Sequence, residues 1–201
     1  MIEIALKTVN LMITSTDNIT LGSWFTFSEP FFRSSILPEV TSAPEAGSLI
    51  PAALKAYPTV LYLHGNAATR AVSTRVQIYS AFSSRMQVNV LTIDYRGFAE
   101  NAGYPTERGT IDDALSAIKW LVGQGAKPED ILVIGHSLGS GIATQSIELA
   151  EAELGQPFRG LVVMAGQASM HHHMETFVPG GVPILRPVKL IPGGWGAYRA
   201  L

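Results

Sequence analysis

The sequence predicts an α/β fold in which an antiparallel N-terminal hairpin precedes a mostly parallel sheet. Short runs that are apolar on both faces alternate with segments of helical periodicity, which is typical of a parallel sheet covered by helices on both sides. The first part of the chain instead alternates with period two on either side of a turn, as hairpins do. A chain of 201 residues is long enough for one domain, 1–201, with a substantial core.

The hairpin is the first predicted element. Val9, Leu11 and Ile13 fall on one face of a strand. A turn cluster follows at Ser15–Asn18, and the alternation resumes at Ile19. Five prolines then interrupt residues 28–58. We interpret this segment as a Pro-rich surface insertion with room for a short helix.

Strands and helices alternate in the rest of the chain. Apolar runs predict strands at 59–63, 88–93, 131–134 and 161–164. Apolar spacing predicts helices at 69–86, 111–122 and 138–153. Thr110 is the predicted N-cap of the second helix, with Asp112 and Asp113 in its first turn.

Composition and charge exclude several classes of protein. The net charge is −2 and there is no run of Lys or Arg, so no nucleic-acid partner is expected. The absence of cysteine excludes disulfide scaffolds, thiolate metal sites and a cysteine nucleophile. We find no signal-peptide pattern and no apolar stretch long enough to span a bilayer. The compartment is left open.

Residues 135–139 carry the strongest chemical signal. They read Gly-His-Ser-Leu-Gly and lie between a predicted strand and a predicted helix, as the G-x-S-x-G nucleophile elbow requires. In that turn Ser137 is strained and exposed, and Gly135 and Gly139 let strand and helix pass closely. The N–H of Leu138 then points to where an oxyanion forms. We expect His136 to pack or hydrogen-bond beneath the serine.

A glycine-rich turn that cradles a phosphate is the alternative interpretation of residues 135–139. Neither the G-x-x-x-x-G-K-[ST] pattern nor a complete G-x-G-x-x-G pattern is present. We therefore expect no cofactor. We favour the nucleophile elbow because the motif has the strand before it and the helix after it.

A second oxyanion donor is predicted after the strand at 59–63. Residues 64–67 read His-Gly-Asn-Ala and follow the strand where α/β folds of this kind place that donor. The N–H of Asn66 is the predicted donor, with Ala67 as its alternative. His64 is predicted to be a structural hydrogen-bonding residue, because it follows the wrong strand for a base.

Four motifs along the chain, given next in sequence order, resemble those of the α/β-hydrolase superfamily. The resemblance is to the branch that contains the monoacylglycerol and lysophosphatidylserine lipases. The motifs are Tyr62–Ala67, Asp94–Phe98, Pro105–Gly109 and Gly135–Gly141. The resemblance implies Ser137 as nucleophile, Asn66 and Leu138 as oxyanion donors, and a lipid ester as substrate. It also implies a structural loop at Asp94–Gly97 and leaves room for peripheral membrane contact. Ala99 and Asn101 stand where this branch usually has Gly and Ser.

The resemblance also implies a general base and an acid from loops after the seventh and eighth strands. The chain ends soon after its sixth predicted strand, so we expect these two residues to be missing and the fold to lack its last strands. The strand at 161–164 should then be an unpaired apolar edge. Residues 166–201 are interpreted as the start of a cap or loop region.

Polar residues after the sixth strand do not replace the missing ones. His171–His173 match no triad histidine of the superfamily, and adjacent side chains cannot all face one direction. They also lack metal-motif spacing, so we expect a polar loop and no metal site. Glu175 is the only nearby carboxylate.

Three functions stay open. The first is a serine hydrolase that cleaves lipid esters through an acyl-enzyme on Ser137. The second is a serine peptidase of the same fold, and the third is an inactive remnant that binds a lipid or protein partner. Phe98, Phe177, Val178 and residues 179–195 either line an acyl pocket or pack in the ordinary way. The oligomeric state is not predicted.

Overall fold

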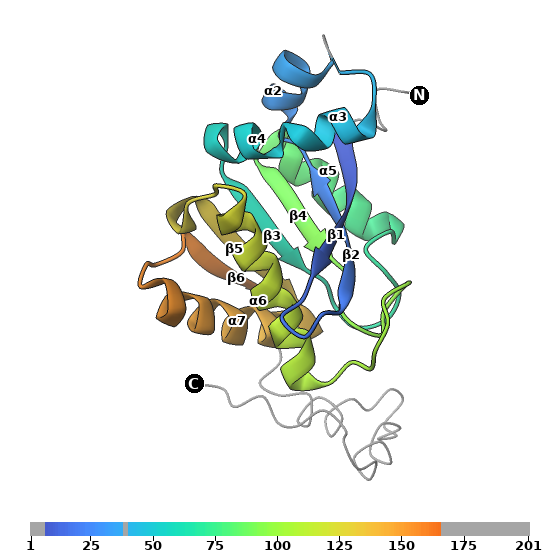
Figure 1. Ribbon diagram of the computed structural model, residues 1–201, viewed down its shortest axis with the longest axis vertical. Coiled ribbons are helices and arrows are strands. Elements are labelled where there is room, and N and C mark those ends of the chain that lie inside the picture. The colour runs from blue at the N-terminus through green and yellow to red at the C-terminus, as the bar shows by residue number, and fades with distance from the viewer. Residues whose placement is uncertain (1–6, 38–39, 166–201) are drawn as a thin grey trace.

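The computed structural model describes residues 7–37 and 40–165, and a sheet of six strands runs through this part of the chain (Figure 1). The strands are β1 (Thr8–Thr14), β2 (Thr20–Thr26), β3 (Thr59–Leu63), β4 (Asn89–Ile93), β5 (Ile131–His136) and β6 (Gly160–Met164). Their order across the sheet is β1-β2-β4-β3-β5-β6.

The sheet combines an antiparallel edge with a parallel body, as predicted. β1 and β2 pair antiparallel from Thr8 opposite Thr26 to Thr14 opposite Thr20. β2 also pairs antiparallel with β4. The pairs β3–β4, β3–β5 and β5–β6 are parallel. The α/β architecture expected from the sequence, an antiparallel N-terminal hairpin beside a mostly parallel sheet, is confirmed by this arrangement.

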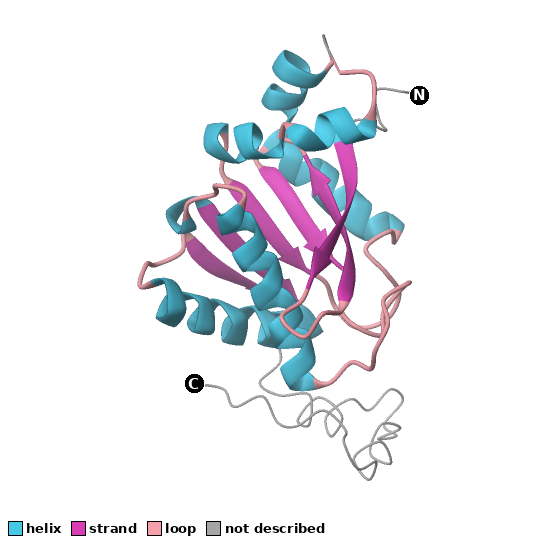
Figure 2. Ribbon diagram, in the orientation of Figure 1, coloured by secondary structure: helices cyan, strands magenta, loops and turns pink. Residues whose placement is uncertain are grey.

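Helices cover both faces of the sheet (Figure 2). The longer helices are α5 (Ser73–Arg85), α6 (Glu107–Gly123) and α7 (Leu138–Leu154), and the 3-10 helix η2 spans Pro128–Asp130. α5 covers one face, and α6 and α7 cover the other. Val60 and Tyr62 of β3 pack with Tyr79 of α5, whereas Leu61 and Leu63 join the core under α6 and α7. β3 is therefore buried at every position.

Residues 28–58 hold more regular structure than the single short helix suggested by the sequence. They form α2 (Glu29–Phe31), the π-helix η1 (Phe32–Ile36), α3 (Ala43–Ser48) and α4 (Ile50–Ala56). Pro30, Pro44 and Pro51 stand in the first turns of α2, α3 and α4, where a missing N–H costs nothing. Ile36 and Leu54 are buried in the main core, so the segment is more than a surface insertion.

Two predicted helix starts are wrong. α5 begins at Ser73 instead of 69. α6 begins at Glu107, and its N-cap is Thr106, whose Oγ1 accepts a hydrogen bond of 3.1 Å from the N–H of Gly109. Thr110, the predicted N-cap, is buried inside the helix and donates to the carbonyl of Glu107 at 3.0 Å.

β6 lies at the edge of the sheet within the described part of the chain, where it pairs with β5 alone. Val162 is 40% exposed and Val163 is 49% exposed. Neighbouring strand residues point to opposite faces, so neither face of β6 is fully covered by residues 7–37 and 40–165.

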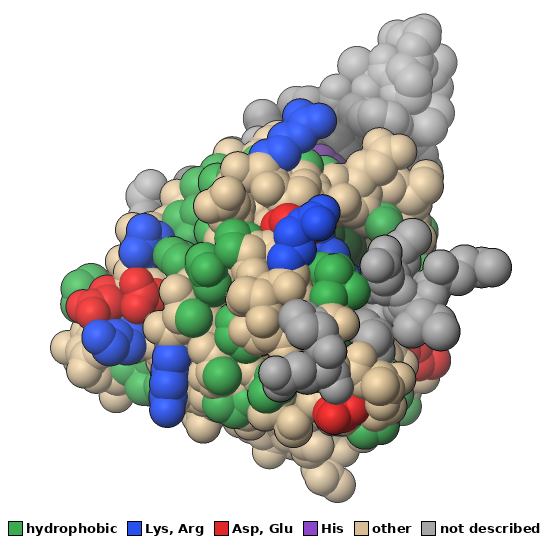
Figure 3. Space-filling view, turned by 90° about the horizontal axis from the view of Figure 1, so that it is seen from above, with side chains coloured by type: hydrophobic (Ala, Val, Ile, Leu, Met, Phe, Trp, Pro, Cys, Tyr) green, Lys and Arg blue, Asp and Glu red, His purple; other side chains and the backbone are tan. Residues whose placement is uncertain are grey.

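Acidic and basic side chains are interspersed on the end of the molecule where α2, α3 and α4 lie (Figure 3). This mixture agrees with the near-neutral net charge of the chain. Across the same described ranges, no helix is both long and apolar enough to cross a membrane.

Candidate active site

Three neighbouring strands end side by side at one edge of the sheet. β3 lies between β4 and β5 and runs parallel to both. The residues that follow these strands, His64, Asp94 and Ser137, are therefore brought to the same edge. In open parallel sheets ligands bind beyond this edge.

Ser137 occupies a strained turn between β5 and α7. Its φ is 52° and its ψ is −114°, a backbone conformation that residues other than glycine rarely adopt. The N–H of Ser137 donates to the carbonyl of Met164 at 2.9 Å, so β6 helps to hold the turn. The helix starts at the next residue, Leu138. Ser137 is half-buried, and its local geometry is the one expected of a nucleophile elbow.

The flanking glycines are required by close backbone contacts. A Cβ at Gly135 would lie 2.3 Å from the carbonyl oxygen of Gly139. A Cβ at Gly139 would lie 2.1 Å from the carbonyl oxygen of Leu63 in β3. Both distances are far below van der Waals contact, so no other residue fits without a backbone shift.

The β3–α5 loop (residues 64–72) passes directly beside Ser137. A Cβ at Gly65 would lie 3.2 Å from Cβ of Ser137 and 3.1 Å from Nδ1 of His136. Asn66 and Ala67, the two candidate donors, follow immediately and are exposed. Ala67 and Ala68 both have positive φ angles, of 61° and 55°. The structure thus places the β3–α5 loop beside the Ser137 turn. The sequence predicts that each of these two segments contributes one N–H donor to the oxyanion.

His64 is fully buried and held at both ring nitrogens. Its Nε2 lies 3.0 Å from Oδ1 of Asp94, and its Nδ1 lies 2.8 Å from the carbonyl oxygen of Gly65. Burial by itself would raise the pKa of Asp94, but hydrogen bonds from His64 and Arg70 lower it overall. His64 therefore has the structural place that the sequence suggests, with no ring nitrogen left for Ser137.

The Asp94–Gly97 segment also has structural partners. The hydroxyl of Tyr95 donates to the carbonyl of His64 at 2.9 Å. The side chain of Asn101 donates to the carbonyl of Asp94 at 2.6 Å and accepts from the N–H of Gly22 at 2.8 Å. Ala99, where glycine is usual in the lipase branch, has a φ of 51°. Alanine therefore adopts a backbone conformation that favours glycine.

His136 and Ser137 have few partners near the turn. Burial, with the nearby charges of Arg75 and His64, lowers the pKa of His136. The Ser137 hydroxyl makes no hydrogen bond to another side chain in the described ranges.

Phe98 packs against the rings of His64 and Tyr95, with its ring centroid 5.7 Å from each of theirs.

Several predicted residues lie outside the described part of the chain. They are His171–His173, Glu175, Phe177, Val178 and residues 179–195. Within the described part, no group of three or more His, Asp or Glu side chains is arranged to hold a metal ion.

Arg75 is a residue that sequence reasoning missed. It lies in the first turn of α5 and donates to carbonyls of the β3–α5 loop, including those of Gly65 and Thr69. No spacing rule could find it, because the loop bends back onto the helix that follows it. Arg70 was missed in the same way; it is buried, pairs with Asp94 and Glu100, and lies over the ring of Trp24.

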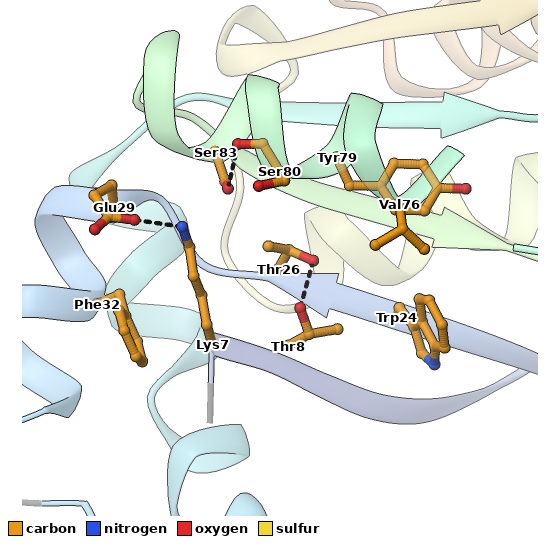
Figure 4. A pocket seen from close by; sticks show the side chains of 10 residues that line it. All are labelled: Lys7, Thr8, Trp24, Thr26, Glu29, Phe32, Val76, Tyr79, Ser80 and Ser83. Atoms are coloured by element: carbon orange, nitrogen blue, oxygen red, sulfur yellow. Dashed lines mark hydrogen bonds and ion pairs between the residues drawn. The ribbon is translucent and has the colours of Figure 1, made fainter. Parts of the chain in front are cut away.

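A cavity of about 370 Å³ lies elsewhere, between the hairpin, α5 and the 28–58 segment (Figure 4). Lys7 and Glu29 form an ion pair at one end of it, and Trp24 and Tyr79 lie at the other. Its lining is Lys7, Thr8, Trp24, Thr26, Glu29, Phe32, Val76, Tyr79, Ser80 and Ser83. The elbow and the β3–α5 loop contribute no residue, so this cavity is separate from the surroundings of Ser137.

The fold and the elbow together define an α/β hydrolase. Residues 58–200 match the family model described as alpha/beta hydrolase fold, and the chain belongs to this family. The lysophosphatidylserine lipase ABHD12 of Danio rerio is 36% identical over 140 residues, which make up 70% of this chain and 35% of that protein. Protein ABHD12B of Homo sapiens is 32% identical over 187 residues, or 92% of this chain and 48% of that protein. The expected superfamily and its lipase branch are confirmed.

The fold has a close counterpart among solved structures. An alpha-beta hydrolase from Vibrio vulnificus superposes with a TM-score of 0.69 at 20% identity, over 96% of this chain and 57% of that one. The chain spans less than half of the length of these two curated relatives.

Proposed function

We propose that this chain carries the nucleophile and the oxyanion hole of a serine hydrolase that cleaves carboxylic esters of lipids. The observation that carries the proposal is the position of Ser137, on a strained turn at a helix N-terminus with the β3–α5 loop beside it. The names of the relatives, lysophosphatidylserine lipases, support a lysophospholipid as the substrate. A monoacylglycerol is the alternative that the motif resemblance implies.

The proposed reaction is an acyl transfer in two steps. Oγ of Ser137 attacks the ester carbonyl, and the N–H groups of Asn66 and Leu138 stabilise the resulting oxyanion. The C–O bond to the alcohol then breaks, which leaves an acyl-enzyme, and water hydrolyses that ester to release the fatty acid.

A general base must take the proton from Ser137. His64 cannot do so, because Asp94 and Gly65 already engage both of its ring nitrogens. We therefore assign neither the base nor its acid partner to any residue of the described ranges. Without a base, the oxyanion hole and substrate binding would leave an acceleration of only about 10³–10⁴ over water, as in triad-deleted enzymes.

Covalent labelling with a fluorophosphonate tests the nucleophile. We expect the folded wild-type chain to be labelled at Ser137 and Ser137→Ala to show no labelling. Ser84→Ala is the matched control, because Ser84 is exposed on α5 and should leave labelling unchanged. A folded wild-type chain that is not labelled would remove the assignment of Ser137.

One observation favours an inactive chain. Within the described ranges, no side chain forms a hydrogen bond with the Ser137 hydroxyl and could act as its base. An inactive lipid-binding chain would bind a lysophospholipid equally well as wild type and as Ser137→Ala, without releasing fatty acid. A peptidase of the same fold would instead also cleave the amide bond of a peptide anilide, which a lipid ester hydrolase leaves intact. Fatty-acid release from monoacylglycerol and lysophosphatidylserine separates these functions.

A further inference from the structure

We propose that Arg75 is a positioning residue that fixes the oxyanion side of the β3–α5 loop by holding its carbonyl groups. The inference rests on the proposed function, in which N–H groups of this loop stabilise the oxyanion. Arg75 itself touches no reacting atom and acts through the peptide units that it binds.

The guanidinium of Arg75 lies within hydrogen-bond distance of four carbonyl oxygens of the loop, three of them consecutive. Its Nη1 donates to the carbonyl of Thr69 at 2.8 Å. Its Nη2 lies 3.0 Å from the carbonyl oxygen of Gly65, 2.9 Å from that of Ala67 and 3.4 Å from that of Asn66. The loop therefore wraps around one cation at the start of α5.

Peptide geometry turns these contacts into a statement about the N–H groups. In a trans peptide unit the C=O and the N–H point in opposite directions, and the described residues contain no cis peptide bond. Because the carbonyl of Gly65 points at Arg75, the N–H of Asn66 points away from it. The same argument for the carbonyl of Asn66 directs the N–H of Ala67, so both candidate donors face away from the guanidinium.

Gly65 shows which part of the loop lies next to Ser137. A Cβ at Gly65 would lie 3.2 Å from Cβ of Ser137, so the donors that turn away from Arg75 belong to the stretch of chain beside the elbow. The ring of His64, held by Asp94, is a second partner of the Gly65 carbonyl. Two side chains from different parts of the fold thus fix one peptide unit.

The loop needs such a clamp. Ala67 and Ala68 are consecutive residues with positive φ, a conformation that costs free energy for any residue with a Cβ. A cation on the carbonyl end of a peptide unit also polarises it and strengthens its N–H as a donor. Only a guanidinium has a planar fork of donors wide enough for several carbonyls, whereas a lysine ammonium is a single point.

The test compares Arg75→Met and Arg75→Lys with Arg85→Met. Arg85 is exposed in the last turn of the same helix and is the matched control. We expect both Arg75 variants to slow fluorophosphonate labelling of Ser137 by about tenfold to a hundredfold, less than the 10²–10³ expected for outright loss of a donor. For a p-nitrophenyl ester, kcat should fall while KM changes little. Arg85→Met should match the wild type.

Amide hydrogen exchange supplies a readout that is independent of activity. The N–H groups of Arg70, Ala71 and Val72 are the hydrogen-bonded amides of the loop. We expect exchange in Arg75→Met to accelerate at residues 70–72 and to stay unchanged in β3 and β5. Labelling at the wild-type rate, or exchange that accelerates throughout the sheet, would overturn the inference. If the folded wild-type chain is not labelled at all, the proposed function fails and exchange alone decides the positioning role. Unchanged exchange at residues 70–72 then overturns that role, and faster exchange confined to them supports it.

Discussion

Gly139 and Gly123 both lie at the ends of helices, but their surroundings differ. A Cβ at Gly139 would lie 2.1 Å from the backbone oxygen of Leu63, whereas a Cβ at Gly123 would meet nothing within 4 Å. The first glycine is needed for the approach of α7 to β3, which places the elbow. The second only ends α6.

This contrast predicts opposite effects of the same substitution. Gly139→Ala should destabilise the fold by about 1–3 kcal/mol or more, because the backbone must move to accept the methyl group. Gly123→Ala should stabilise it by up to about 1 kcal/mol, since alanine loses less entropy in a helix. Denaturant unfolding of the two variants measures both, and equal midpoints would contradict the close-approach argument.

Among the elements, Arg96 joins the hairpin to α6. It donates to Asp113 of α6 at 2.7 Å and to Asp17 in the β1–β2 turn at 2.6 Å. Asp113 is buried, whereas Asp17 is about half exposed. Hydrogen bonds from Arg96 and Ser15 lower the pKa of Asp17 from 3.8 to about 2. The pair therefore links the turn of the hairpin to the loop that follows β4.

The lowered pKa of Asp17 predicts a pH-dependent contribution to stability. The carboxylate stabilises the fold above its ordinary pKa of 3.8, and this contribution is lost as the pH falls toward 2. Asp17→Asn should lower the melting temperature slightly at pH 6, because a half-exposed pair is worth below about 1 kcal/mol. Melting curves from pH 6 to pH 3 should show the gap between variant and wild type closing. A gap that stays constant would refute the pairing.

The sequence predicts whole elements better than their limits. β3 is predicted at its observed residues, because Pro58 precedes its apolar run and polar residues follow it from His64. The sequence predicts room for only one short helix in the 28–58 segment, because Pro44 and Pro51 look like interruptions but stand in the first turns of helices. The sequence predicts the N-cap of α6 at Thr110, but the backbone conformation places it at Thr106, one turn earlier.

At the scale of the whole molecule, the sheet has an apolar edge at β6. In the described part of the chain β6 pairs only with β5, and Val162 and Val163 are both exposed. An uncovered strand of this kind is a template for pairing with another chain.

A charge at this edge should reduce self-association. We expect Val163→Lys to lower the associated fraction seen in sedimentation velocity at high protein concentration, with a change in stability within about 0.5 kcal/mol, as for other exposed sites. Tyr104→Lys adds the same charge at an exposed loop residue and should leave association unchanged. Equal association of Val163→Lys and wild type would exclude the edge as the contact.

The sequence by itself determined the fold class and the elbow, because both are written in contiguous residues: an apolar run, a Gly-x-Ser-x-Gly turn and a helix. The pairing of this turn with Gly65, and the clamp of Arg75 on the loop, were decided only by the tertiary structure. Apolar periodicity encodes which residues are buried, but it does not encode that β3 lies between β4 and β5. That strand order, and the bend of the β3–α5 loop back onto α5, bring together side chains and carbonyls that no local pattern connects.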